Sequence, residues 1–220
     1  MVKKQVVGES LPRPDALAKV QGRARYIKDM LKSRKEVLIG RALFPPYAHA
    51  RIVSIDVREA TCLPGVAAVV TAKDLPGFNG YGVAALDKPV LAENEVRYQG
   101  DPVVFVAAKD QKTVDQALSL ISVEYEPLSV CEDPREALKP NASLIHKNHP
   151  LSKNNNISSQ WRVEKGKAHE AIAQADIILE SDFETQMADH AYLEPEICIA
   201  EPDEITGGIT LIAPGHSPHL

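Results

Sequence analysis

The chain has 220 residues, enough for one large domain or two small ones, and its 44% hydrophobic and 25% charged residues are typical of a globular protein. Its net charge of −5 offers no positive surface for nucleic acid or for an anionic membrane. The longest apolar runs, at residues 66–70 and 103–108, are too short to span a bilayer, and the amino terminus lacks the apolar core of a signal peptide. We therefore expect a cytoplasmic protein that binds neither nucleic acid nor membrane.

The three cysteines, Cys62, Cys131 and Cys198, are odd in number and far apart. No two of them have the spacing of zinc ligands or iron–sulfur ligands. We expect three reduced thiols that act as small apolar side chains, which fits a cytoplasmic location.

The first predicted element is a short helical turn that Asp15 is placed to cap and Gly22 to end. Acidic residues accompany the cations of residues 28–35, which favours a solvated loop there. A strand is expected at residues 36–44, where two consecutive prolines stop it.

From residue 36 to residue 130, strand patterns alternate with at least one clear helix, which Asp110 is placed to cap. Residues 66–70 have the length and branching of a strand buried on both faces, and residues 76–89 predict a loop without a phosphate-binding pattern. The alternation predicts an α/β unit, best suited to a small mixed sheet with helices on one side. Further strands are expected at residues 51–58, 103–108 and 121–126.

Prolines, serines and three consecutive asparagines at residues 139–160 predict a linker or a long surface connection. A helix near residues 168–175 should follow it, and then strands at residues 176–183, 197–201 and 208–213. This last segment is smaller than a lone core usually requires, and its final strand leaves an unpaired edge. We expect it to be the first part of a domain whose remainder lies elsewhere.

Residues 186–196 place a His, a Tyr and three carboxylates between two predicted strands. Ionisable groups that a rigid scaffold positions often form a site. The alternative is a corner between two strands with solvated charges.

Six segments in order resemble the molybdenum-binding large subunit of the xanthine dehydrogenase and aldehyde oxidase family, the molybdenum hydroxylases. The resemblance runs almost from end to end. The matching segments are RPDALAKVQGRARY at 13–26, PYAHARIVSID at 46–56, LPGVAAVVTAKDLPG at 63–77, VRYQGDPV at 96–103, VEYEPL at 123–128 and HAYLEPE at 190–196.

The resemblance implies an α+β chain in two parts. Residues 1–140 would form the family's α/β hammerhead domain, residues 141–162 a linker, and residues 163–220 the incomplete start of the mixed α/β molybdopterin-binding domain. The implied cofactor is molybdenum on molybdopterin cytosine dinucleotide. Partners would be the remaining part of this subunit and the subunits or domains that carry 2Fe-2S clusters and FAD.

Such enzymes hydroxylate a carbon next to nitrogen or oxygen, take the oxygen from water, and pass electrons through two [2Fe-2S] clusters to FAD. The family's glycine-rich pterin loop and its catalytic glutamate lie beyond this sequence, so no catalytic residue or metal ligand is assigned here. Purine-oxidising members place a glutamine two residues before the position of His190. Here that residue is Ala188, and the nearest glutamine is Gln186.

Within the resemblance, His190 and Glu194 are the expected residues that line or support the cofactor, with Gln186 as a further candidate. The alternative is structural, with His190 fixing the turn by a hydrogen bond and Glu194 pairing with a cation. We expect packing for His49, and free imidazoles for two histidines near the carboxyl terminus, His216 and His219.

Two functions other than that of an enzyme subunit remain open. One is a non-enzymatic assembly or interaction module that supplies the hammerhead fold to a complex. The other is an inert gene fragment.

Overall fold

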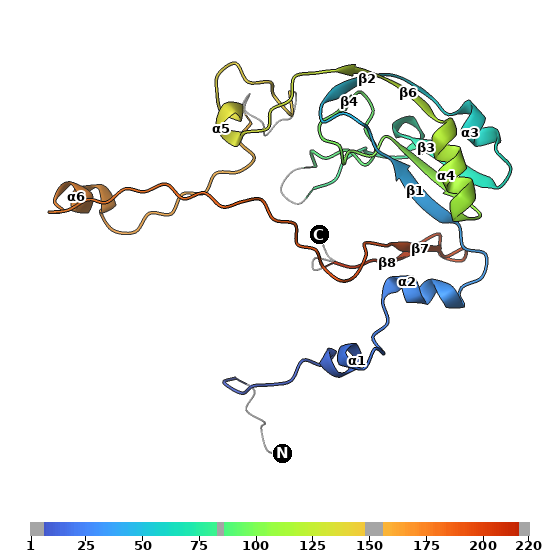
Figure 1. Cartoon of the computed structure of the whole chain (residues 1–220), viewed down its shortest axis with the longest axis horizontal. Helices are drawn as coiled ribbons and strands as arrows, with labels where there is room; N and C mark the ends of the chain where they lie inside the picture. Colours follow the sequence, from blue (N-terminus) through green and yellow to red (C-terminus); the bar gives the residue numbers. More distant parts are fainter. Residues whose placement is uncertain (1–6, 83–85, 148–155, 216–220) are drawn as a thin grey trace. The chain divides into compact units, whose positions relative to one another are not determined.

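The computed structural model describes residues 7–82, 86–147 and 156–215. Its contacts divide the chain into two compact units (Figure 1). The central unit comprises Leu38–Thr185. The split unit joins two distant parts of the sequence, Met1–Val37 and Gln186–Leu220.

The central unit contains two three-stranded sheets in which all strand pairs are antiparallel. The predicted mixed sheet is therefore wrong. The main helix, α4 (Gln111–Leu120), joins strands that belong to different sheets, so it forms no crossover between parallel neighbours. The first sheet has the order β1 (Ile39–Leu43), β5 (Val104–Ala108), β3 (Val66–Thr71), and the second β4 (Glu95–Val96), β2 (Ala50–Asp56), β6 (Ser122–Pro127).

The core of the central unit is built around β5, the middle strand of its sheet. Val104 and Val106 are fully buried, and Val106 packs with Ala117 of α4 and Ala60 of α3 (Arg58–Cys62). The expectation that residues 66–70 are buried on both faces is wrong, because β3 lies at the sheet edge and leaves two alanines exposed.

The predicted cap of α4 is confirmed. The Asp110 carboxylate accepts a hydrogen bond from the Thr113 N–H at 2.8 Å. This bond lowers the pKa of Asp110, because it stabilises the ionised carboxylate. The chain then returns as β6, as the apolar pattern indicates.

The split unit holds α1 (Ala16–Val20), α2 (Ile27–Met30), a 3-10 turn η1 (Leu31–Ser33), and the antiparallel hairpin of β7 (Ile199–Pro202) and β8 (Ile209–Ile212). The helical turn and both late strands are confirmed. Asp15 does not cap α1, because its carboxylate is paired with Arg13 and Lys19 instead. The expected loop at residues 28–35 is largely helical, and Gly22 ends the first turn at a φ of +67°.

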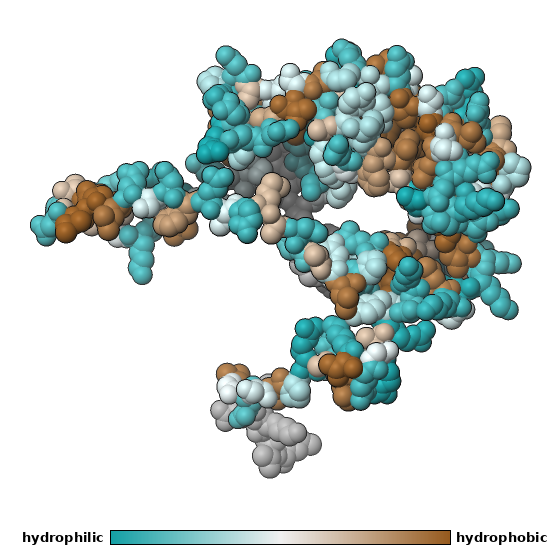
Figure 2. Space-filling view, viewed as in Figure 1, coloured by the Kyte–Doolittle hydropathy of each residue, from teal (hydrophilic) through white to brown (hydrophobic). Residues whose placement is uncertain are grey.

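The strand expected at residues 176–183 does not form. A strand needs a neighbour for its backbone groups, and no described segment pairs with it. Its apolar side chains are uncovered, with Ile177 79%, Leu179 91% and Phe183 93% exposed. Figure 2 shows apolar side chains uncovered near α6 (Ala168–Ala173), which has no buried residue.

Hydrogen bonds connect the region predicted as a linker to residues before and after residue 141. The Asn156 amide donates to the Ala137 and Ser143 carbonyls, each at 3.0 Å, and its oxygen accepts from the Ile145 N–H at 3.0 Å. The Arg97 guanidinium donates to the Ile145 carbonyl at 2.7 Å. Short helices at Ala72–Asp74 (η2) and Pro134–Ala137 (α5) complete the unit.

None of the helices in the described ranges is long and apolar enough to cross a membrane. The three cysteines are free thiols, as expected. Cys62 and Cys198 are exposed, so the expectation that they pack as apolar side chains is wrong for these two, and Cys131 is half-buried.

Candidate functional site

The stretch of residues 186–196 runs without helix or strand in the split unit and leads into β7. The sequence predicts a connection between two strands, but only the strand that follows it exists. Glu194 is half-buried, and the other residues of the stretch are exposed. The local fold therefore presents most of its polar side chains to solvent.

The backbone turns sharply directly after His190. Ala191 has a φ of +44°, a left-handed conformation that is unfavourable for a residue with a Cβ. The Tyr192 hydroxyl donates a hydrogen bond to the Glu196 carboxylate, and this bond is the main cause that raises the pKa of Tyr192. Both features shape the chain around Glu194.

Glu194 is bound to a distant part of the sequence. Its Oε1 accepts a hydrogen bond from the backbone N–H of Ile27 at 3.2 Å, at the first residue of α2. First-turn N–H groups have no partner within a helix, so the carboxylate satisfies an otherwise orphaned donor. No cation among the described residues pairs with Glu194, so the backbone N–H of Ile27 is the partner that the structure shows for it.

His190 and Gln186 are exposed, and neither makes a hydrogen bond or ion pair with a residue that the structure describes. The described residues thus show no hydrogen bond by which His190 would fix the turn, and its role stays a prediction. Gln186, His190 and Glu194 form no hydrogen bond or ion pair with one another in the structure. His216 and His219 lie outside the described residues.

A second contact joins the same two segments. Arg34 Nε donates to Glu201 Oε1 at 2.5 Å, with the two side chains 25% and 44% exposed. The hydrogen bond raises the pKa of Arg34 and lowers that of Glu201, because each charge stabilises the other. No local pattern predicts this pair.

One overall signal in the sequence does point to it. The first 37 residues hold ten lysines and arginines and four acids, whereas residues 186–220 hold six acids and neither lysine nor arginine. Opposite net charges of this size favour association of the two segments.

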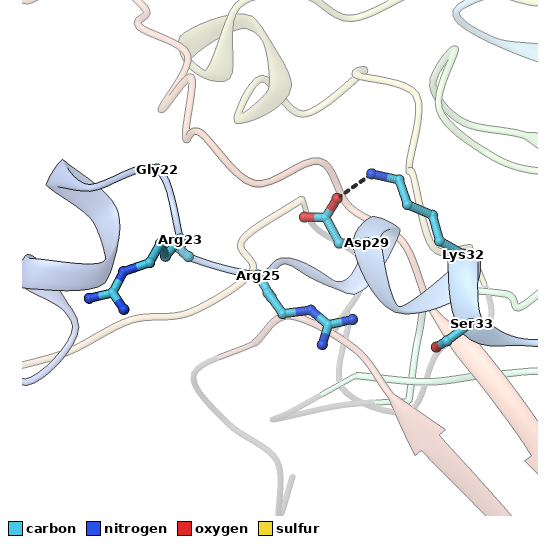
Figure 3. A pocket seen from close by; sticks show the side chains of 7 residues that line it. Gly22, Arg23, Arg25, Asp29, Lys32 and Ser33 are labelled. Atoms are coloured by element: carbon cyan, nitrogen blue, oxygen red, sulfur yellow. Dashed lines mark hydrogen bonds and ion pairs between the residues drawn. The ribbon is translucent and has the colours of Figure 1, made fainter.

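A pocket of about 430 Å³ is lined entirely by residues between Gly22 and Ser33 (Figure 3). The Lys32 ammonium binds Asp29 at 3.0 Å, which lowers the pKa of Asp29, while Arg23 points away from this pair. The cations thus do not converge on one point. The lining residues are Gly22, Arg23, Ala24, Arg25, Asp29, Lys32 and Ser33.

His49 is buried in the central unit, with Nδ1 at 2.5 Å from the Ser129 carbonyl and Nε2 at 2.7 Å from Glu95 Oε1. Both ring nitrogens are engaged, which agrees with the packing role expected for it. A pocket of about 220 Å³ beside Glu95 is lined mostly by polar groups. Among the residues with described positions, no group of three or more His, Cys, Asp or Glu could hold a metal ion.

Two family models match the chain in succession. The model described as "Aldehyde oxidase and xanthine dehydrogenase, a/b hammerhead domain" matches residues 21–129, and the "Molybdopterin cofactor-binding domain" matches residues 148–220.

Curated relatives cover nearly the whole chain. It is 38% identical to one subunit of a probable xanthine dehydrogenase of Bacillus subtilis, over 91% of this chain and 26% of that protein. It is 32% identical to the nicotinate dehydrogenase large molybdopterin subunit of Eubacterium barkeri, over 98% of this chain and 48% of that protein. The chain thus spans between a quarter and a half of the length of these relatives.

Solved structures agree with the sequence matches. A Cu,Mo-CO dehydrogenase covers 94% of this chain with a TM-score of 0.79 and 31% identity, and the match spans 27% of that chain. The aldehyde oxidoreductase of Desulfovibrio gigas covers 92% with a TM-score of 0.75 and 27% identity, over 23% of that chain. The chain belongs to the aldehyde oxidase and xanthine dehydrogenase family, with an α+β fold that joins a hammerhead domain to the start of a molybdopterin-binding domain.

Proposed function

We propose that the chain is part of the large subunit of a molybdenum hydroxylase that oxidises an aldehyde or an N-heterocycle. The observation that carries this proposal is the pair of family models, matched in order at residues 21–129 and 148–220. Relatives named for xanthine, nicotinate and carbon monoxide match more than 90% of the chain. Because the relatives differ in substrate, the choice of substrate class rests on this chain's own residues.

The exposed stretch fits the cofactor as a set of hydrogen-bond partners. When bound, molybdopterin with its molybdenum supplies the redox centre. The Gln186 amide and the His190 imidazole are unengaged within the described part of the chain, and both can hydrogen-bond the polar edge of a pterin. Glu194 is already bound to Ile27, so its part is to hold the backbone on which His190 lies. We therefore propose Gln186 and His190 as the residues that contact the cofactor, and Glu194 as the residue that supports them.

The same segment does not fit the phosphate groups of a dinucleotide. Residues 186–220 contain six carboxylates and no lysine or arginine, which disfavours a nearby polyanion. Contacts to the phosphates of molybdopterin cytosine dinucleotide must therefore come from other residues. The glycine-rich loop of the family is the source that the proposal implies.

The exposed apolar side chains of residues 176–183 support the proposal that another part of the subunit covers them. Ile177, Leu179 and Phe183 would gain from burial against another sheet or strand. We propose that the remaining part of the molybdopterin-binding subunit covers them, because the relatives are two to four times longer than this chain. We also propose that other subunits carry the 2Fe-2S clusters and FAD, and that the protein is cytoplasmic. The proposed domain boundaries lie at residues 140 and 162.

Purification of the tagged full chain from its native cells tests the proposal. We expect a complex that contains a flavin, iron and molybdenum. The double variant Leu179→Asp, Phe183→Asp should lose the complex, and the control Glu59→Ala, at an exposed position of α3, should keep it. Recovery of the chain in a complex without flavin and molybdenum would instead support a non-enzymatic module, and recovery alone an inert fragment.

A further inference from the structure

The two segments of the split unit carry opposite net charges, and two contacts join them. Ile27 binds Glu194, and Arg34 binds Glu201. Each contact joins residues that are 167 positions apart. The two contacts therefore join two points of one segment to two points of the other, and the points on each segment lie seven residues apart.

We propose that residues 7–37, hereafter the arm, form an electrostatic clamp on residues 186–201, and that Arg34 is a positioning residue for the stretch that carries Gln186 and His190. The clamp acts on the backbone of this stretch and leaves both side chains free. Only the identity of what they bind rests on the proposed function.

Few apolar side chains are buried in the split unit, so polar contacts must hold its two segments together. Ile27 and Ile199 are the buried apolar side chains of this unit within the ranges described. Each is next to one of the two contacts, since Ile27 supplies the N–H and Ile199 lies two residues before Glu201. With so small an apolar core, the pairing of arm and stretch depends strongly on Glu194 and Glu201.

The geometry distinguishes Arg34 from the other cations of the arm. Lys32 binds Asp29, and Lys19 and Arg13 bind Asp15, so these pairs stay within the arm. Arg34 alone among the described cations of the arm forms an ion pair with the second segment. Its side chain is also less exposed than that of Lys32, so its ion pair is less screened by solvent.

Hydrogen exchange followed by mass spectrometry on the full chain, without cofactor, tests the clamp. In Arg34→Ala, the backbone amides of Ile27 and of residues 199–201, which lie at the two contacts, should exchange about two- to fivefold faster, the range for a partly exposed ion pair. The matched control Lys32→Ala removes an equal charge from the arm and should leave these rates within about twofold of the wild type. The charge-reversed pair Arg34→Glu with Glu201→Arg should restore slow exchange, and high salt should weaken the wild-type protection.

Equal effects of Arg34→Ala and Lys32→Ala would overturn the proposal, because net charge alone would then hold the arm. Failure of the reversed pair to restore protection would overturn it as well, since Arg34 would then act by packing. The readout needs neither molybdenum nor substrate. A chain that shows the clamp but never assembles into a hydroxylase would therefore refute the proposed function and leave the clamp intact.

Discussion

The carboxylate of Glu194 accepts a hydrogen bond from the backbone N–H of Ile27 at 3.2 Å, across 167 positions of the sequence. A residue expected at the cofactor thus has a backbone partner in the arm. This hydrogen bond directly constrains the conformation of the stretch that carries His190. This relationship leads to the first prediction.

Glu194→Ala should expose the Ile27 amide to exchange. Loss of one hydrogen bond to a charged group costs about 1.5 kcal/mol, so the exchange rate of this amide should rise roughly tenfold. Glu194→Gln keeps an acceptor oxygen and should raise it less. Amide exchange by NMR measures both, and an unchanged rate in Glu194→Ala would show that the bond contributes nothing in solution.

The Arg34–Glu201 pair predicts a pH dependence of the split unit. The folded pKa of Glu201 lies below its ordinary value of 4.5, so the unfolded chain binds the proton more readily. The pair therefore stabilises the folded state above about pH 4.5, and this contribution is lost as the pH falls through the lowered folded pKa. Amide shifts around Glu201, followed by NMR from about pH 6 to about pH 3, should show this titration.

Arg34→Ala is the control for this titration. It should move the midpoint of Glu201 upward, toward the value of an unpaired glutamate. The same midpoint in both proteins would mean that Arg34 does not bind Glu201 in solution.

The capping bond from Thr113 to Asp110 predicts a loss of stability in the central unit. Asp110→Ala should lower the free energy of unfolding by about 1 kcal/mol, because the first turn of α4 loses an acceptor. Asp110→Asn retains a capping oxygen and should cost only a few tenths of a kcal/mol. Urea unfolding followed by circular dichroism measures both. If Asp110→Asn lost as much stability as Asp110→Ala, the charge of Asp110 rather than its capping oxygen would be the cause.

Ala188 predicts the substrate class of the assembled enzyme. Alanine cannot donate the hydrogen bond that a glutamine gives to an oxygen on the metal, a loss of about 1.5–3 kcal/mol or one to two powers of ten in rate. Gln186 lies two residues away, about 6.5 Å along an extended chain, which exceeds the reach of a hydrogen bond. We expect a preference for aldehydes or N-heteroaromatic acids over hypoxanthine.

The comparison of these substrates on the reconstituted complex checks this prediction, with Ala188→Gln as the matched variant. The variant should gain activity toward hypoxanthine. A preference for hypoxanthine that Ala188→Gln does not alter would contradict the argument.

The sequence could predict those features whose causes are local. The cap of α4 depends on Asp110 and a helical apolar period, and the hairpin of β7 and β8 on two short apolar runs. Residues 176–183 carry an equally strong strand pattern, but a strand forms only where another strand meets it. Periodicity gives no sign of whether that neighbour is present.

The site shows the same limit. Motif resemblance identifies Gln186, His190 and Glu194 but gives no partner for any of them. The partners of Glu194 and Glu201 lie 167 positions earlier, beyond the reach of any spacing rule. The opposite charges of the two terminal segments are the one signal in the sequence that indicates their pairing.

The metal content of the complex purified through this chain tests the central claim most directly. If the chain is part of a molybdenum hydroxylase, elemental analysis should find molybdenum in a constant ratio to the chain, together with flavin and dye-linked oxidation of an aldehyde or N-heterocycle. A stable complex that contains this chain but neither molybdenum nor such activity would contradict the claim.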